Sequence, residues 1–136
     1  MVSLSSVLSG LSLWRKRRPF DAKHYWDDRH ASHGTALTGV GHIGLSEAQN
    51  YADYEAKISK LTGLLERQIG PVTGQSVLDA GCGIGVFTNA FAKRGARMTC
   101  VDFSPNAIAI ARNAVPEASF QVCELDAIDA DNIYEH

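Results

Sequence analysis

Residues 77–85 read Val-Leu-Asp-Ala-Gly-Cys-Gly-Ile-Gly, and this stretch decides the fold. Apolar residues lead into Asp79, and glycines then alternate at positions 81, 83 and 85 before a helical pattern begins. A parallel strand that ends in glycines and opens a helix forms a ligand site at the carboxyl end of a sheet. Gly81 and Gly83 permit a tight turn and a close approach between ligand and backbone. The stretch therefore predicts a ligand crevice.

Strand and helix patterns alternate along the rest of this region. The sequence predicts strands at 76–80, 97–101 and 119–123, and helices at 84–94 and from Ser104-Pro105 to just before Pro116. Ser104 is suited to cap the second helix and Pro105 to its first turn. Strict alternation of strand and helix implies right-handed crossovers and a parallel sheet. The predicted fold class is α/β, a Rossmann-like doubly wound parallel sheet.

The sequence divides into three parts. Residues 1–19 form a leader, in which apolar residues recur at helical spacing before a basic run at 15–18 and Pro19. Residues 20–49 form a lead-in that begins with aromatic residues and continues as a glycine-containing loop. Residues 50–136 form the sheet-containing domain. Its first helix is predicted to start at a capping box, Ser46 to Gln49, and to end at Gly70-Pro71.

Composition restricts the partners. The 136 residues carry a formal net charge of -2, which gives no electrostatic case for nucleic acid. No apolar run approaches the roughly 20 residues of a membrane span. The leader has its charges after its apolar residues, the reverse of a secretory signal, so either a surface tail or membrane-surface contact through residues 4–18 is expected.

Cys82, Cys100 and Cys123 fit buried thiols in a reducing compartment, which predicts a cytoplasmic protein.

A second acidic residue suggests the type of ligand. Asp102 ends the second strand, 23 positions after Asp79, where a carboxylate is expected to hold ribose hydroxyls. A dinucleotide site needs G-x-G-x-x-G/A, but the sixth position is Val86 counted from Gly81 and Thr88 counted from Gly83. A carboxylate before the glycine loop also disfavours a pyrophosphate and suits a ligand with a positive amino group. An adenosine joined to an amino acid fits both ends.

These residues resemble the class I S-adenosylmethionine-dependent methyltransferases, over about residues 50–136. The resemblance lies in Val77–Gly85, in Val-Asp-Phe-Ser-Pro at 101–105 and in Glu-Leu-Asp-Ala at 124–127. Tyr25–Arg29 is a weaker match to the lead-in of some bacterial members. The resemblance implies S-adenosylmethionine as the cofactor, and methyl transfer by in-line displacement to an unidentified acceptor. A small-molecule acceptor is favoured.

The resemblance also implies roles for individual residues. The segment Asp79–Gly83, with Gly81 and Cys82, would line the methionine part of the cofactor, Cys82 through its backbone. Asp102 would hold the ribose hydroxyls, and Phe103 would flank the adenine. Asp126 would accept a hydrogen bond from the adenine amino group, beside Ala127. No catalytic residue is assigned.

The family sheet has seven strands in the order 3-2-1-4-5-7-6, and this sequence supplies the first three. Ile133-Tyr134 resembles the entry to the fourth. We therefore expect a fragment or truncated reading frame, with the fold incomplete after the third strand. The strand at 76–80 would then be an exposed edge, open to self-association.

Other functions stay open. One alternative is a non-catalytic cofactor-binding fragment or partner subunit, and another is an NAD(P)-dependent oxidoreductase, which the missing third glycine disfavours. A transferase that uses decarboxylated S-adenosylmethionine is a further alternative. The spacings of His24, His30, His33 and His42 match no standard metal-ligand pattern, so a solvated or substrate-side loop is expected and no metal site.

Overall fold

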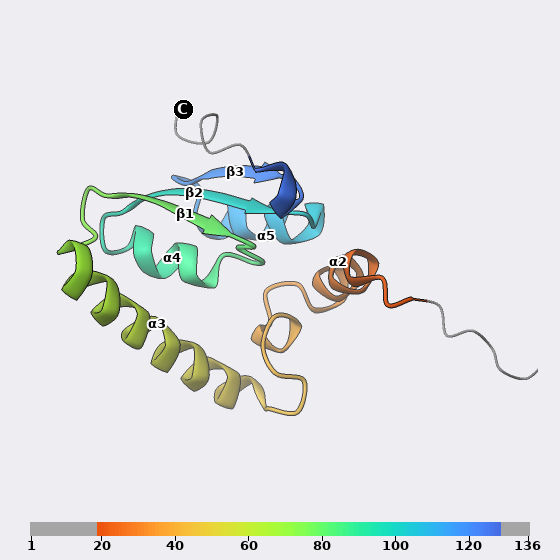
Figure 1. Ribbon diagram of the computed structural model, residues 1–136. Coiled ribbons are helices and arrows are strands. Elements are labelled where there is room, and N and C mark those ends of the chain that lie inside the picture. Colours follow the sequence, from red (N-terminus) through yellow and green to blue (C-terminus); the bar gives the residue numbers. More distant parts are fainter. Residues whose placement is uncertain (1–18, 129–136) are drawn as a thin grey trace, which may run out of the picture.

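The computed structural model describes residues 19–128. The predicted leader, apart from Pro19, and the predicted strand entry at Ile133-Tyr134 lie outside the described residues. Three parallel strands form one sheet, β1 (Ser76–Ala80), β2 (Arg97–Asp102) and β3 (Ser119–Val122), in the order β1-β2-β3. The helices α4 (Val86–Ala92) and α5 (Pro105–Ala114) connect them and lie on the same side of the sheet (Figure 1).

The predicted α/β class with a parallel, Rossmann-like sheet is confirmed. The register aligns Ala80 with Val101 and Asp102 with Val122, so the three strands end at one edge of the sheet. Within residues 19–128, β1 pairs with β2 on one side and with no strand on the other, as the sequence predicts. The strand bounds differ from the prediction by at most one residue, since β2 extends to Asp102 and β3 ends at Val122.

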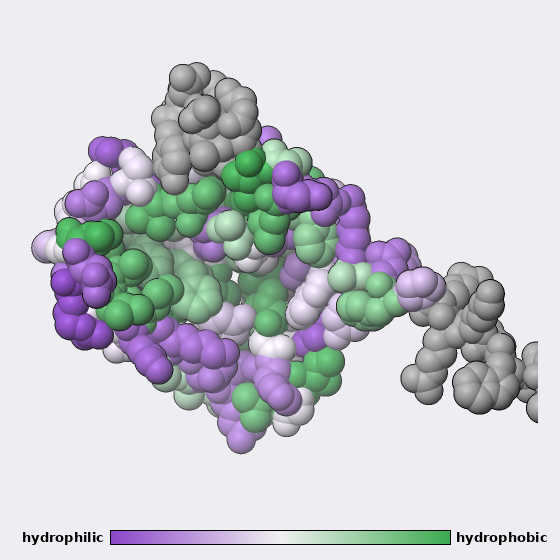
Figure 2. All heavy atoms as spheres, viewed as in Figure 1, coloured by the Kyte–Doolittle hydropathy of each residue, from purple (hydrophilic) through white to green (hydrophobic). Residues whose placement is uncertain are grey.

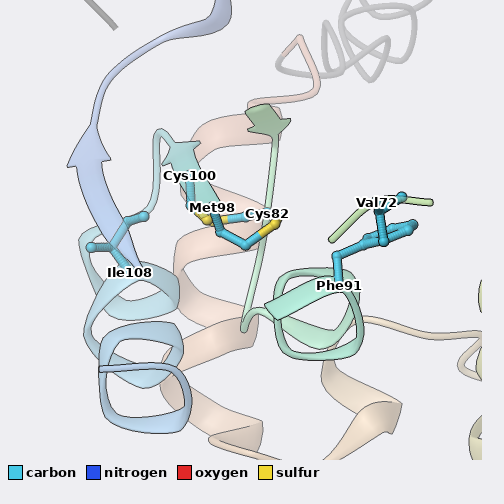
Figure 3. Packing of buried hydrophobic residues seen from close by; sticks show 6 residues of the cluster. All are labelled: Val72, Cys82, Phe91, Met98, Cys100 and Ile108. Carbon is cyan, nitrogen blue, oxygen red and sulfur yellow. The ribbon is translucent and has the colours of Figure 1, made fainter. Parts of the chain in front are cut away.

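The core fills the space between the sheet and its two helices. It contains Met98 and Cys100 from β2, Phe91 from α4 and Ile108 from α5, joined by Val72 and Cys82 from the segments that flank β1 (Figure 3). Burying an aliphatic or aromatic side chain of this size contributes roughly 1.5–3 kcal/mol. Because the Cys82 side chain is part of this cluster, the loop that follows β1 is anchored directly in the core.

The helix α4 is shorter than the predicted 84–94. Gly85 is its N-cap with φ of 83°, and Gly95 follows its end with φ of 84°, so left-handed glycines bracket the helix. Gly85 also allows α4 and α5 to approach closely, because a Cβ at Gly85 would lie 3.0 Å from Ala111 Cβ in α5.

Gly85→Ala is expected to destabilise the fold by about 2–4 kcal/mol, since it combines a left-handed alanine with crowding against Ala111. Gly74→Ala is the matched control, because Gly74 also has a positive φ of 75° but open space around its added Cβ. Chemical denaturation of the three proteins measures both costs. Equal losses in the two variants would show that the contact with Ala111 contributes nothing.

The lead-in forms a docked helix and a looped connection. The helix α2 (Ala22–His33) packs on α5, and the 3₁₀ helix η2 (Leu37–Gly39) follows it. Next comes α3 (Glu47–Ile69), which runs beyond α4 as seen from the sheet (Figure 1). The predicted capping box is confirmed, because the Ser46 N–H donates to Gln49 Oε1 at 2.9 Å and the Gln49 N–H donates to Ser46 Oγ at 3.2 Å.

The apolar residues that recur at helical spacing along α3 are only partly buried. Its middle positions are half-buried, but Tyr51 and Ile69 near the two ends are 57% and 55% exposed. The reason is length, since the helix is 23 residues long and α4, against which it packs, has seven. None of the helices within residues 19–128 has both the length and the apolarity needed to cross a membrane.

Candidate functional site

A pocket of about 270 Å³ lies at the carboxyl ends of β1 and β2. Five of the eight residues predicted for the site share its wall, namely Gly81, Cys82, Gly83, Asp102 and Phe103. The remaining wall comes from α2, the loop after η2, α3 and the start of α4, through Trp26, His30, Val40, Tyr54, Ile84, Val86 and Phe87. The topology thus gathers segments far apart in the sequence around one small cavity.

Asp102 is the polar centre of this pocket. Its side chain is buried, and its Oδ2 accepts a hydrogen bond from the Gly83 N–H at 2.8 Å. Its Oδ1 accepts from the Ser104 N–H at 2.9 Å. An ionised carboxylate has about four acceptor sites, so each oxygen can take a further hydrogen bond from a ligand. Asp102 therefore joins the loops after β1 and β2 and keeps acceptor capacity toward the pocket.

The glycine loop folds back over the end of β2. The N–H groups of Gly81 and Cys82 both donate to the Val101 carbonyl, at 2.8 and 3.0 Å. Gly81 has φ of 80° and Gly83 has φ of 53°. A Cβ at Gly81 would meet nothing within 4 Å, so its positive φ, rather than crowding within the chain, requires glycine there.

Asp79 lies beneath this loop rather than in the pocket wall. Its Oδ2 accepts a 2.6 Å hydrogen bond from Thr88 Oγ1 on α4. Burial raises the pKa of the Asp79 carboxyl, and the hydrogen bonds from Thr88 partly oppose that rise. The predicted contact between Asp79 and the ligand stays a prediction.

Replacing Asp79 with asparagine tests this half-buried carboxyl group. A carboxyl whose pKa is raised on folding binds more protons in the native state than in the unfolded state. It therefore stabilises the fold at a pH below its pKa in the unfolded chain. This contribution is lost as the pH rises through its pKa in the folded protein. Relative to Asp79→Asn, the wild type is therefore expected to lose stability as the pH rises above about 4, the ordinary pKa of an aspartate carboxyl. Urea denaturation of both proteins on either side of this pH measures the difference. A constant difference would contradict the raised pKa.

Asp126 and Ala127 are not part of the pocket wall. Both belong to the 3₁₀ helix η3 (Leu125–Ala127), which follows β3, and both are exposed. The order β1-β2-β3 accounts for this separation, because the pocket is centred on the ends of β1 and β2. Their predicted adenine contacts stay predictions.

Among the wall residues that sequence reasoning missed, Val40 and Tyr54 come from outside the sheet domain's first turn and helix. The Tyr54 hydroxyl donates to the Val40 carbonyl at 3.1 Å, so the two residues hold each other at the pocket. Tyr54 belongs to the apolar periodicity of α3, but that pattern indicates only that the residue is packed, not that it lines a site. No sequence pattern indicated a role for Val40. Trp26 belongs to the Tyr25–Arg29 segment that the sequence did single out.

Arg29 holds the lead-in together. Its side chain is buried, and Nη2 donates to the carbonyls of Thr38 and Gly41 at 2.6 and 3.1 Å. Nη1 donates to the Tyr25 hydroxyl at 2.8 Å. The guanidinium carbon also lies 5.2 Å from the centroid of the Trp26 ring. One side chain therefore fixes the positions of α2 and of the loop that carries Val40.

The histidines separate in space. His30 lies in the pocket wall, whereas His24 pairs with Asp28 on the surface at 3.2 Å. His33 Nδ1 contacts the Arg29 carbonyl, and His42 Nδ1 accepts from the Gly44 N–H within its own turn. Among residues 19–128, no group of three or more potential metal-ligating His, Cys, Asp or Glu side chains comes together.

A larger groove of about 740 Å³ adjoins the pocket. It runs between α3 and the outer surfaces of α4 and α5, and it shares Tyr54, Ile84 and Val86 with the smaller pocket. Figure 2 shows hydrophobic residues gathered on the face that contains α4, bordered by hydrophilic residues over α3. We call the groove of about 740 Å³ the α3–α4 groove.

Comparison with known families identifies the domain. Residues 77–134 match the family described as a methyltransferase domain. This segment is a methyltransferase domain. The resemblance found in the sequence is therefore confirmed, and so is S-adenosylmethionine as the cofactor of the family to which this methyltransferase domain belongs.

Two curated proteins illustrate the range of relatives. The ubiquinone biosynthesis O-methyltransferase of Xylella fastidiosa is 42% identical over 52 residues, which cover 38% of this chain and 21% of that protein. The 23S rRNA (uracil(1939)-C(5))-methyltransferase of Thiobacillus denitrificans is 27% identical over 132 residues, 92% of this chain and 29% of that protein. The matched parts thus span less than a third of these relatives' lengths.

A solved methyltransferase shares the fold. The magnesium protoporphyrin IX methyltransferase of Synechocystis PCC 6803, crystallised with bound S-adenosylmethionine, superposes with a TM-score of 0.65 and 19% identity. The match covers 82% of this chain and 59% of that chain. At this identity the comparison establishes the Rossmann-like methyltransferase fold.

Proposed function

We propose that this chain binds S-adenosylmethionine in the pocket at the ends of β1 and β2 and serves methyl transfer to a small-molecule acceptor. The observation that carries the proposal is the convergence of the glycine loop, Asp102 and Phe103 on one cavity of the methyltransferase domain. In this proposal Gly81–Gly83 contact the methionine part through their backbone, Asp102 accepts from the ribose and Phe103 flanks the adenine. Asp126 and Ala127 approach the adenine from η3.

The local charge supports this cofactor over a dinucleotide. A dinucleotide puts its pyrophosphate at the N-terminus of the helix that follows the first strand. Here Asp79 hydrogen-bonds Thr88 in the first turn of that helix, α4, and brings negative charge to its start. Val86, where the dinucleotide sequence pattern has glycine or alanine, lies in the pocket wall. A cationic ammonium is better suited to this environment than a pyrophosphate.

The proposed reaction is an in-line displacement at the activated methyl group, which the cofactor supplies when it is bound. The residues of this chain contribute orientation, and orienting two reactants can contribute about 7–11 kcal/mol of the barrier. Asp102, through its bonds to Gly83 and Ser104, fixes the two loops that would hold the cofactor.

The α3–α4 groove supports a small organic acceptor. It is continuous with the pocket through Tyr54, Ile84 and Val86, and its floor includes the apolar residues Ile58 and Ile110. The net charge of -2 gives no general attraction to nucleic acid, although one relative methylates ribosomal RNA. We therefore propose an apolar acceptor that enters along this groove.

A second candidate function is a cofactor-binding module that serves another subunit. It is supported by β1, which pairs with no strand on one side among residues 19–128, because an edge strand can pair with a strand from another chain. Turnover of an acceptor by this chain alone would exclude this candidate, whereas turnover that requires a second protein would support it.

Isothermal titration calorimetry tests the proposed cofactor. The full chain is expected to bind S-adenosylmethionine and S-adenosylhomocysteine, and excess NAD is expected to leave both affinities unchanged. Circular dichroism of the same samples establishes that the protein is folded. A folded protein that binds neither ligand, or that NAD saturates, would overturn the proposed cofactor.

A further inference from the structure

His30 is a wall residue whose role the proposed function leaves open. It lies on α2, its side chain is 4% exposed, and it faces the same pocket as Asp102. Its Nδ1 is 3.1 Å from Ser104 Oγ, and its ring stacks on that of Trp26 with 6.1 Å between the centroids. The surrounding hydrogen bonds determine which ring nitrogen carries the proton.

Ser104 Oγ has one proton to give and two lone pairs to accept with. It donates to Asp27 Oδ1 at 2.6 Å, and it accepts from the Ala107 N–H at 3.1 Å. Hydrogen bonds from Ser104 and Asn106 lower the pKa of Asp27, so that carboxylate is ionised at neutral pH and has no proton to return. The remaining contact, to His30, must therefore be a hydrogen bond from Nδ1–H to Ser104 Oγ.

Burial lowers the pKa of His30. The negative charges of Asp102 and Asp27 partly oppose this shift, and the positive charge of Arg29 adds a small lowering. His30 is therefore neutral at neutral pH, and its single ring proton is on Nδ1. Nε2 is then a bare acceptor. Among residues 19–128 Nε2 has no hydrogen-bond partner, and it is not among the side-chain atoms that are fully buried without one. Nε2 therefore keeps some accessible surface, and it belongs to a residue that lines the pocket.

We infer that His30 Nε2 and the Asp102 carboxylate form a paired acceptor site for the vicinal diol of the cofactor ribose. A diol presents two O–H donors, and each oxygen of Asp102 already accepts one backbone N–H. A second acceptor on the facing helix lets the two hydroxyls bond to separate groups. The inference rests on the proposed function, because the diol belongs to the proposed cofactor.

This arrangement gives the Asp27–Ser104–His30 chain a positioning role. Asp27 orients the Ser104 hydroxyl, Ser104 fixes the His30 tautomer, and His30 then offers an acceptor rather than a donor. The same Ser104 hydroxyl caps α5. The lead-in helix is thereby coupled to the two loops of the proposed cofactor site.

The test compares His30→Phe with wild type for binding of S-adenosylhomocysteine and of its 2′-deoxy and 3′-deoxy analogues by calorimetry. His30→Phe keeps an aromatic ring against Trp26 and removes both nitrogens. It is expected to weaken S-adenosylhomocysteine binding about 2–12-fold, the usual range for one hydrogen bond. The loss is expected to disappear for the analogue that lacks the bonded hydroxyl. His30→Gln, which can present an amide oxygen near the Nε2 position, is expected to recover part of the affinity.

His24→Phe is the matched control, since His24 is an exposed residue of the same helix, and its affinity for all three ligands is expected to equal that of wild type. Equal losses for S-adenosylhomocysteine and both analogues in His30→Phe would indicate a purely structural role and overturn the inference, as would no loss at all. In either case wild-type binding leaves the proposed function intact. A folded wild type that fails to bind S-adenosylhomocysteine overturns both.

Discussion

Asp102→Ala is expected to reduce the affinity for S-adenosylmethionine by about 100-fold or more, the loss expected when a charged acceptor of hydrogen bonds is removed. It should also destabilise the protein by about 2–4 kcal/mol, because the N–H groups of Gly83 and Ser104 lose their acceptor in a buried setting. Calorimetry measures the first effect and chemical denaturation the second. Both follow from one carboxylate that joins two loops and faces the pocket.

Two further variants separate these effects. Asp102→Asn keeps one oxygen acceptor and similar volume, so its stability should lie between those of wild type and alanine, while its affinity stays low because the charge is lost. Asp28→Ala removes an exposed carboxylate from α2 and should leave affinity unchanged. If Asp102→Ala binds S-adenosylmethionine as the wild type does, Asp102 does not hold the cofactor.

Arg29→Ala is expected to destabilise the protein by about 2–4 kcal/mol, because Thr38, Gly41 and Tyr25 all lose a charged donor. The lost stacking on Trp26 adds to this cost. The damage should be concentrated in the lead-in, where limited proteolysis is expected to cut between α2 and α3. Trp26 fluorescence should shift as well, and cofactor affinity should fall because part of the pocket wall is released.

Arg29→Lys tests the geometry of the contact. A lysine ammonium cannot reproduce the planar fork that reaches two carbonyls and a hydroxyl together, so less than half of the stability should return. Arg67→Ala, at an exposed position of α3, is the matched control and should leave stability within about 0.5 kcal/mol of wild type. Proteolysis equally rapid in Arg29→Ala and wild type would contradict the proposed role of Arg29.

Local signals in the sequence were sufficient for the secondary structure of the sheet domain. The apolar runs and glycines around residues 77–85 predicted β1, the turn and the following helix, and Ser104-Pro105 predicted the start of α5. Such features act through neighbours along the chain, so periodicity and capping reveal them. The bounds of α4 were less accurate, because Gly85 and Gly95 adopt left-handed conformations that the apolar periodicity of the helix does not reveal.

The site was only partly predictable for the same reason. Gly81, Cys82, Gly83, Asp102 and Phe103 follow the ends of adjacent parallel strands, where the topology alone brings them together. The part of the pocket wall formed by Val40 and Tyr54 could not be predicted in this way, since these residues reach the pocket through a contact between a loop and a helix. No local pattern encodes that contact.

The sequence by itself determined a parallel α/β domain, the glycine loop and the two acidic strand ends, because each of these features depends on residues that are adjacent in the sequence. Only the tertiary structure decided what each side chain faces. It directs Asp79 to Thr88 and Asp102 to the pocket, although both are aspartates at the ends of parallel strands. It also brings His30 to Ser104 across 74 positions of sequence. Those outcomes depend on which helix packs over which strand end, and they arise when apolar surfaces from distant segments are buried together.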